Sequence, residues 1–391
     1  MGLSRIPSIY LNEEHDALRQ SASTFVEREI RPHADDWEAR GEFARDLYPK
    51  AAKAGFLGVR YEERWGGSGL DFLSTCVLCE ELVKGDSVGT AVGLLAHSEF
   101  ALSTLADEAS DELKKAWLVP AIRGELVASI GVSEPGAGSD VASMATSARL
   151  EGDDYVISGQ KTYITNGPRA DFITLAVRTG EAGPSGISLV VFPTDTPGFQ
   201  VGRSLEKLGS RASDTGELFF DQCRVPVANR IGEEGRGMRY ILSHFGGERL
   251  VIAAFAVGIM ERLIELGIEH ANQRKVFGSS LSSLQTWRHR FAEMTTRLEA
   301  TRALTYQAAR LLSEGDPHGD MAVSMAKLYA AEAVQNVAAE VLQLHGGYGQ
   351  IEESPIPRYY RDVAGFSIGA GTSEIMREII SRSLLNTKGK V

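Results

Sequence analysis

The hydrophobic pattern of this 391-residue chain changes its period twice, and this change constrains the fold more than any other feature. Between residues 12 and 124, apolar side chains recur every three or four positions, which is typical of amphipathic helices. Between residues 125 and 235, short apolar runs alternate with turn signals, which favours β-strands. Long helical patterns return from residue 237 onward. The sequence therefore predicts an α+β chain with an all-helical N-terminal domain, a middle β-domain and a helical C-terminal domain, at residues 1–124, 125–235 and 236–391.

The middle segment has the sequence features of an antiparallel β-domain. Its apolar runs, such as Phe172–Arg178 and Ile187–Phe192, are short and are separated by glycine-rich turns, such as the one at residues 180–186. In the C-terminal segment, Leu284 and Trp287 begin a series of apolar residues at alternating steps of three and four. That spacing predicts the seam of a helix bundle.

Composition describes an ordinary globular protein and excludes some partners. Hydrophobic residues make up 43% and charged residues 24% of the chain, and the net charge is -11. Nucleic acids and anionic membranes need a basic surface, so we do not expect either as a partner. No apolar run is long enough to span a bilayer, so no membrane span is expected.

The cysteines and the N-terminus predict a cytoplasmic location. The 3 cysteines are too few and too unevenly spaced for a disulfide framework. Cys76 and Cys79 are one helical turn apart within an apolar stretch, so we expect them in the core. The first residues lack an apolar signal core. The 8 histidines include no pair at metal-binding spacing, so no metal site is expected.

A glycine-rich loop follows the first apolar run of the middle segment. The run Leu126–Val132 reads as a buried strand and opens into GVSEPGAGSD, where Gly136, Ala137 and Gly138 leave backbone N–H groups uncovered. Such a loop can hold an anion or a planar ring. It is not a Rossmann fingerprint, because the third glycine position is occupied by Val141 and no crossover helix follows, which disfavours a nicotinamide cofactor.

The loop and four further segments resemble the signatures of the acyl-CoA dehydrogenase family, in the family's order along the chain. The segments are GVSEPGAGSD at 131–140, YVISGQKTYITNG at 155–167, residues 274–285, QLHGG at 343–347 and GAGTSE at 369–374. The resemblance implies the family fold, in which an antiparallel, β-barrel-like middle domain lies between an N-terminal helical domain and a C-terminal four-helix bundle. It also implies FAD, an acyl-CoA substrate, electron transfer to an electron-transferring flavoprotein, and a homotetramer built as a dimer of dimers.

The resemblance assigns cofactor contacts residue by residue. Within the chain, we expect the flavin to contact Ile130, Val132, Ser133, Gly138, Ser139, Tyr163, Ile164 and Thr165. Contacts to the FAD of a neighbouring subunit are implied for Arg274, Phe277, Gln285, Gln343, Gly346 and Gly347, and a phosphate site at the last helix for Thr372 and Glu374.

Each of these assignments has a plainer alternative. Tyr163 can be an ordinary strand aromatic. Arg274 can be a solvated charge at a helix end, and residues 347–349 can be a turn that ends a helix. Thr372 can simply cap the last helix.

The position of the catalytic base departs from the family's commonest pattern. Many members carry a carboxylate where this chain has Ala370, and a methyl group cannot take a proton. The isovaleryl-CoA and long-chain branches instead carry their base where this chain has Glu248, followed by an arginine as Arg249 follows here. By resemblance we expect Glu248 to abstract the α-proton. The alternative is a carboxylate at a helix N-terminus, with Gly246 and Gly247 marking the helix start.

The resemblance also assigns contacts to the acyl-CoA, and several other functions stay open. Substrate contacts are expected at Ser139, Ser185, Gly247, Arg249, Ala370 and Gly371. Gly369 replaces a tyrosine of the medium-chain branch, which leaves room for a branched or bulky acyl group unless a neighbouring side chain fills it. The alternatives are an acyl group on a carrier protein, an oxygen-using relative, and a flavoprotein without catalytic activity.

Overall fold

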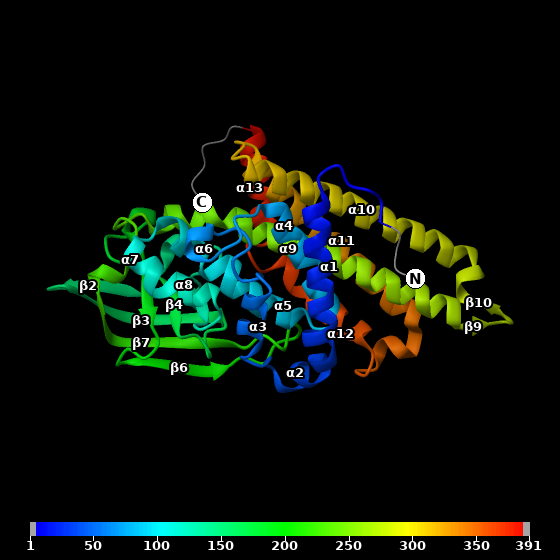
Figure 1. Ribbon diagram of the computed structural model, residues 1–391, viewed down its shortest axis with the longest axis horizontal. Coiled ribbons are helices and arrows are strands. Elements are labelled where there is room, and N and C mark those ends of the chain that lie inside the picture. The colour runs from blue at the N-terminus through cyan, green and yellow to red at the C-terminus, as the bar shows by residue number, and fades with distance from the viewer. Residues whose placement is uncertain (1–4, 386–391) are drawn as a thin grey trace.

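The computed structural model describes residues 5–385, and the order of its elements confirms the predicted sequence of a helical, a β and a second helical domain. The expectation drawn from the first residues rests partly on residues 1–4, which lie outside the described range. Figure 1 shows the sheet at one end of an elongated molecule and the bundle extending toward the other end.

The N-terminal domain consists of short helices joined by tight turns. Asp71 starts the most buried of them, α4, by accepting a hydrogen bond of 2.8 Å from the backbone N–H of Ser74. Cys76 and Cys79 are free and fully buried in α4, as predicted. The helices are α1 (Glu13–Phe25), α2 (Ala34–Arg40), α3 (Leu47–Lys53), α4 (Phe72–Leu82), α5 (Val88–Leu95), α6 (Ser103–Glu108), α7 (Asp111–Leu113) and α8 (Val119–Ile122).

The middle domain is one sheet of mixed direction. Its strands are β1 (Ala128–Gly131), β2 (Ser147–Glu151), β3 (Asp154–Thr165), β4 (Phe172–Arg178), β5 (Ile187–Pro193), β6 (Phe199–Ser204), β7 (Thr215–Pro226) and β8 (Arg230–Ile231). They are ordered β6-β7-β3-β2-β4-β5-β8, and β1 pairs with β4. Most pairs are antiparallel, as expected.

Two pairs are parallel, so the sheet is mixed and departs in this detail from the antiparallel domain that the sequence predicted. Both β1 and β2 run parallel to β4. Since β5 occupies the other edge of β4, β1 and β2 lie along the same edge, one after the other. The segment between them, residues 132–146, therefore protrudes from an otherwise continuous edge, and this segment contains the glycine-rich loop.

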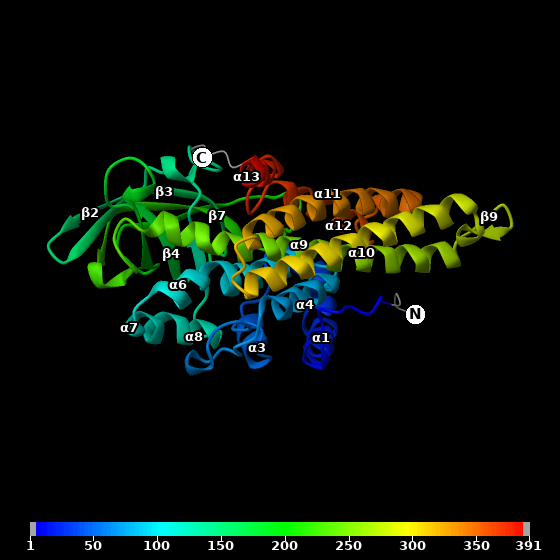
Figure 2. The same cartoon turned by 90° about the horizontal axis from the view of Figure 1, so that it is seen from above.

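The C-terminal domain is built on three long helices, α9 (Gly237–Gln273), α10 (Gln285–Ser313) and α11 (Gly319–His345), which pack against one another. A two-stranded hairpin, β9 (Lys275–Val276) and β10 (Ser279–Ser280), joins the first two. The helices α12 (Pro355–Asp362) and α13 (Ser373–Leu385) both contact α11. Figure 2 shows α13 on one side of the bundle and the N-terminal helices on the opposite side.

The central helix α9 links the core of the N-terminal domain to the bundle. Every residue from Leu250 to Met260 is buried, as its apolar sequence indicated. Gly258 lets α9 approach α4 closely, because a Cβ at this position would lie 2.2 Å from the backbone oxygen of Glu80. The position of α9 is therefore fixed by packing on both sides.

Candidate active site

The predicted base, Glu248, lies in the interior of α9. The helix begins at Gly237, so Glu248 is about three turns from its start and about 17 Å along its axis. The alternative that Gly246 and Gly247 mark a helix start is therefore wrong. A glycine pair inside a helix costs about 1 kcal/mol per residue relative to alanine, so its presence calls for a packing reason.

That reason is the close approach of two neighbouring segments. A Cβ at Gly247 would lie 3.2 Å from the ring of Phe72 at the start of α4. A Cβ at Gly246 would lie 3.2 Å from a carboxylate oxygen of Asp320 at the start of α11. Because these two residues have no side chains, the first residues of α4 and α11 can approach the backbone of α9 just before Glu248. Periodicity alone did not reveal this function of the glycine pair.

Glu248 is a buried carboxyl group without a hydrogen-bond partner among residues 5–385. It is 8% exposed, and no described side chain or backbone group donates a hydrogen bond to it. Burial raises its pKa to about 7, although the positive charges of Arg249 and His244 oppose this. A carboxyl group with this pKa exchanges its proton near neutral pH, which suits a general base.

Arg249 connects α9 to the loop of the GAGTSE motif. It is 7% exposed, and its Nε has no hydrogen-bond partner. Its Nε lies 3.8 Å from the point where a Cβ on Gly371 would be. Burial lowers the pKa of Arg249. The structure therefore places Arg249, the residue after Glu248, against the loop at Gly371.

The loop itself has an unusual backbone and a buried anchor. Ala370 adopts a left-handed conformation with φ of 52°. Lys327 of α11, whose side chain is fully buried, donates a hydrogen bond of 2.5 Å to the backbone oxygen of Gly371. Sequence analysis missed Lys327. Thr372 accepts a hydrogen bond of 3.3 Å from the N–H of Ile375, so it caps α13, and the plainer alternative for Thr372 is confirmed.

The glycine-rich loop is anchored by a buried ion pair that sequence analysis also missed. The carboxylate of Glu134 accepts hydrogen bonds from the backbone N–H groups of Ala145 and Thr146, at 2.6 and 2.9 Å. It also pairs with the ammonium of Lys161 at 2.8 Å. Glu134 lies in the motif at 131–140 and Lys161 in the motif at 155–167. Their place in these motifs was the sequence signal that could have pointed to them. The pair fixes the loop to β3.

Two of the predicted cofactor residues lie side by side at the start of this loop. The N–H of Thr162 donates a hydrogen bond of 3.0 Å to the backbone oxygen of Ser133. The next residue, Tyr163, has φ of 60°, is 71% exposed and stands at an irregularity in the pairing of β3 with β7. A bulge that turns an aromatic ring outward is unlike an ordinary strand position. The ring is free to cover a planar molecule held near Ser133.

Open space lies above the loop. A Cβ at Gly136 or Gly138 would have no neighbour within 4 Å. Ser139 is exposed, Ile130, Val132 and Thr165 are half-buried, and Ile164 is buried. A ligand can therefore approach the backbone of the loop directly.

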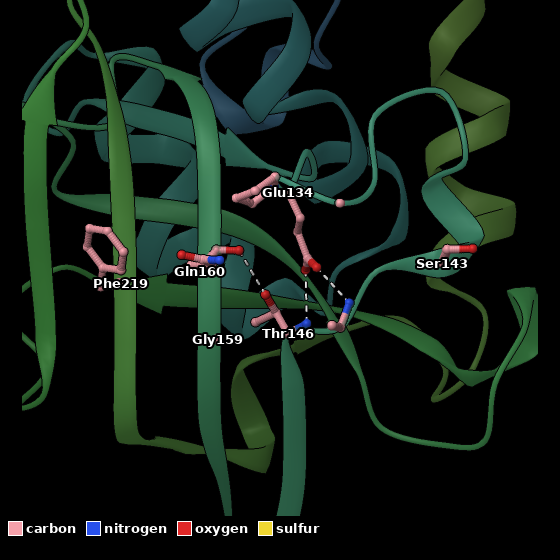
Figure 3. Close-up of a pocket in the computed structure, with 9 residues that line it drawn as sticks. Glu134, Ser143, Thr146, Gly159, Gln160 and Phe219 are labelled. Carbon is pink, nitrogen blue, oxygen red and sulfur yellow. Dashed lines mark hydrogen bonds between the residues drawn. The ribbon is translucent and has the colours of Figure 1, made fainter.

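A pocket of about 360 Å³ adjoins the loop on the side of the sheet (Figure 3). In the figure, the side chain of Glu134 points toward the backbone N–H groups that donate hydrogen bonds to it. Phe219 lies on the opposite side of the pocket. Glu248 is not among the residues that line it. Since the oxygens of Glu134 already have partners, this pocket offers no unpaired charge and we do not assign the chemistry to it.

The residues predicted to contact a neighbouring subunit gather at the far end of the bundle. Arg274 follows the last turn of α9, and Phe277 in the β9–β10 hairpin is fully exposed with φ of 49°. The rings of His270 and His345 are 4.3 Å apart, which places the ends of α9 and α11 together. The exposed members of this group are Arg274, Phe277, Gln285, Gln343, Gly346 and Gly347.

The remaining predicted residues lie at opposite ends of the site. Ser185 is exposed, and its backbone oxygen is 2.5 Å from the position of a Cβ on Gly235, just before α9. Glu374 is exposed in the first turn of α13. Within the described chain, no cluster of three or more metal-ligating side chains occurs. No helix between residues 5 and 385 is long and apolar enough to cross a membrane.

Family models match almost the whole chain. Those for the N-terminal, middle and C-terminal domains of acyl-CoA dehydrogenases match residues 12–125, 129–223 and 235–385. The chain belongs to the acyl-CoA dehydrogenase family. The predicted family is thereby confirmed, and the protein is an oxidoreductase of the acyl-CoA dehydrogenase type.

Curated acyl-CoA dehydrogenases cover nearly the full length of the chain. The long-chain specific enzyme of Sus scrofa mitochondria is 37% identical over 391 residues, which cover 99% of this chain and 89% of the relative. The mitochondrial isovaleryl-CoA dehydrogenase of Pongo abelii is 35% identical and covers 95% of this chain and 89% of its own length. These relatives belong to the two branches that the position of Glu248 resembles.

Solved structures match the fold as closely. A probable acyl-CoA dehydrogenase from Mycobacterium abscessus is 41% identical, with a TM-score of 0.93, and covers 96% of this chain and 100% of its own. A chain from a structural study of the electron-transferring flavoprotein of Acidaminococcus fermentans is 34% identical, with a TM-score of 0.94. The match covers 97% of this chain and 100% of that one. PigA, solved with FAD and proline, is 29% identical, with a TM-score of 0.93 and coverage of 97% and 99%.

Proposed function

We propose that this acyl-CoA dehydrogenase oxidises an acyl-CoA to its 2,3-enoyl thioester, with Glu248 as the base that removes the α-proton. The observation that carries the proposal is the environment of Glu248: a buried carboxyl group without a hydrogen-bond partner in the described chain, whose pKa burial raises to about 7. The next residue, Arg249, lies against the loop at Gly371. Desolvation makes the carboxylate a stronger base than in water.

The loop at Ala370 supports the second requirement of the reaction. Removal of an α-proton places negative charge on the thioester oxygen, and preorganised N–H donors stabilise such a charge. The left-handed backbone at Ala370 and the hydrogen bond from Lys327 to the Gly371 carbonyl hold this loop in one conformation. We infer that the N–H of Ala370 donates to the thioester oxygen, with Gly247 and Arg249 flanking the acyl group.

The residues around the glycine-rich loop fit FAD. Their backbone is open at Gly136 and Gly138, and the exposed Tyr163 follows Thr162, whose N–H donates to the backbone oxygen of Ser133. The similar structure of PigA was solved with FAD. When bound, FAD accepts the hydride that leaves the β-carbon. Ser133, Ser139 and Thr165 are the polar groups that we infer to orient it.

Two groups of predicted FAD residues lie at opposite ends of the molecule, which supports a multimer. The glycine-rich loop belongs to the sheet, whereas the residues near Phe277 lie at the hairpin at the other end (Figure 1). One FAD cannot contact both groups of the same chain. We therefore infer that a second copy completes each site, in a homotetramer built as a dimer of dimers.

The acyl group and the electron acceptor follow from weaker observations. Apart from its two chain neighbours, a Cβ at Gly369 would have only the backbone oxygen of Gly365 within 4 Å among the described residues, so the space beside it is open. This supports a branched or bulky acyl group. A solved chain of the same fold comes from a structural study of an electron-transferring flavoprotein, which supports such a protein as the electron acceptor.

The test is anaerobic reduction of the bound flavin by acyl-CoA thioesters, followed by its loss of visible absorbance. Glu248→Gln keeps the size of the side chain and removes the base. We expect it to retain FAD and to lose at least about 10²-fold in the rate of reduction. Glu269→Gln, an exposed position on the same helix, is the matched control and should reduce at the wild-type rate.

Other outcomes separate the alternatives. Unchanged reduction in Glu248→Gln would refute the assignment of the base. Reduction by an acyl group on a carrier protein, but not by acyl-CoA, would identify a carrier-protein substrate. A flavin that no thioester reduces would identify an oxygen-using or non-catalytic relative.

A further inference from the structure

His244 lies one helical turn before Glu248 on α9, and both of its ring nitrogens face hydrogen-bond acceptors. Nδ1 is 2.7 Å from the backbone oxygen of Tyr240, and Nε2 is 2.9 Å from a carboxylate oxygen of Asp107 on α6. Nδ1 is also 3.2 Å from the hydroxyl oxygen of Ser243, whose own proton is donated to the Tyr240 oxygen at 2.9 Å. A carbonyl and a carboxylate can only accept, so both contacts are satisfied when both nitrogens carry a proton. The geometry therefore corresponds to an imidazolium ring.

The surroundings of the ring support this charged form. The side chain of His244 is 12% exposed, whereas that of Asp107 is 65% exposed. Burial disfavours the charged ring, but the contacts with Asp107 and the Tyr240 carbonyl outweigh this effect and raise the pKa of His244. Residues four apart on a helix lie on the same face, about 5–6 Å apart at their Cβ atoms. The positive charge is thus close to Glu248.

We propose that His244 is a positioning residue for the base: held as an imidazolium by Asp107, it favours the carboxylate form of Glu248. The proposal rests on the proposed function of Glu248. It goes beyond that function because a contact between α6 and α9 would then control the ionisation of the base. The N-terminal domain therefore takes part in setting the ionisation of the active site.

Other charged groups face this pair from the neighbouring elements. Arg249 is the second cation next to Glu248, and Asp320 of α11 opposes it. Arg60 approaches Asp107 but is paired with Glu99 at 2.9 Å. The remaining groups that act on the pair are Glu108 of α6 and Lys114. His244 is therefore the cation whose removal changes the charge next to Glu248 while leaving these pairs in place.

The test is a pH titration of Glu248 in the purified FAD-containing enzyme by infrared spectroscopy. The carbonyl stretch of the protonated carboxyl group is assigned as the band that Glu248→Gln lacks. We expect His244→Asn to move the midpoint upward by about one pH unit, since a close opposite charge lowers a carboxyl pKa by about that amount or more. The pH profile of kcat/KM should move by the same amount.

A double-mutant cycle tests whether Asp107 acts through His244. Asp107→Asn, at a mostly exposed position, should also raise the midpoint, and the double variant should match His244→Asn alone. His318→Asn is the matched control, because His318 pairs with Asp316 at the same distance of 2.9 Å but is exposed and lies outside α9. Its midpoint should equal that of the wild type.

Two results would overturn the proposal. One is an unchanged midpoint in both His244→Asn and Asp107→Asn; if His244→Asn does not fold, an unchanged midpoint in Asp107→Asn alone is sufficient. The other is an equal shift from Asp107→Asn with and without His244. The titration needs no turnover, so it gives an answer even if no acyl-CoA reduces the flavin, and failure of the proposed function is distinguishable from failure of this inference.

Discussion

The ammonium group of Lys327 donates a 2.5 Å hydrogen bond to the backbone oxygen of Gly371 and so ties α11 to the loop before α13. Burial of Lys327 lowers its pKa to about 8. A buried ammonium group therefore holds the backbone segment that Arg249 approaches. This contact leads to the first prediction.

Lys327→Met should loosen the loop. The Gly371 carbonyl loses its donor, at a cost of about 1–3 kcal/mol, partly offset because an ammonium group is no longer buried. We expect faster hydrogen–deuterium exchange at residues 369–372, measured by mass spectrometry, and a lower rate of flavin reduction. The exposed Lys53→Met, on α3, is the control. Unchanged exchange in this loop would show that Lys327 does not anchor it.

Glu248 should make stability depend on pH. Its pKa is about 7 in the folded chain, above the ordinary value of 4.5, so the folded state binds more protons between about pH 4.5 and 7. The free energy of unfolding therefore falls as pH rises through this window, by up to about 3 kcal/mol. Glu248→Gln cannot ionise and should be more stable than wild type at pH 8 but similar at pH 4.5. Urea denaturation at pH 4.5 and pH 8 measures the free energy of unfolding of both proteins. The same difference between them at the two pH values would contradict the prediction.

The buried pair of Arg60 and Glu99 should be costly to break singly. Their side chains are 16% and 2% exposed, and the guanidinium group stacks 4.0 Å from the ring centre of Phe72. Glu99→Leu leaves a buried cation and should cost about 3–5 kcal/mol in the free energy of unfolding. The double variant Arg60→Met, Glu99→Leu should lie closer to the wild type than Glu99→Leu does. A single variant as stable as the wild type would disprove this.

Gly258→Ala should force α9 away from α4. Its Cβ would lie 2.2 Å from the Glu80 oxygen and 2.6 Å from Val83, so the helices must separate. We expect the free energy of unfolding to fall by about 1–3 kcal/mol or more. Gly365→Ala is the control, because a Cβ there has no neighbour within 4 Å. Thermal unfolding of both variants measures the contrast, and equal midpoints would refute the packing argument.

From the order of residues alone, the order of the domains, the family and a candidate base could be predicted. Hydrophobic period depends on local geometry, so it separates helices from strands without tertiary information. The motifs carry the family because they lie on contiguous stretches. The apolar run after Glu248 indicated that its helix is buried, and the structure agrees.

Tertiary structure decided what surrounds the base. Gly246 and Gly247 looked like a helix start and are instead a narrow point inside α9, because α4 and α11 pack there. The parallel pairing of β1 and β2 with β4, the buried pair of Glu134 and Lys161, and the contacts of Lys327 and His244 all join residues far apart in the chain. Such contacts leave no periodic signal. Even where both partners lie inside recognised motifs, as Glu134 and Lys161 do, the sequence does not show that they pair, since burial and partner choice are set only when separate segments meet.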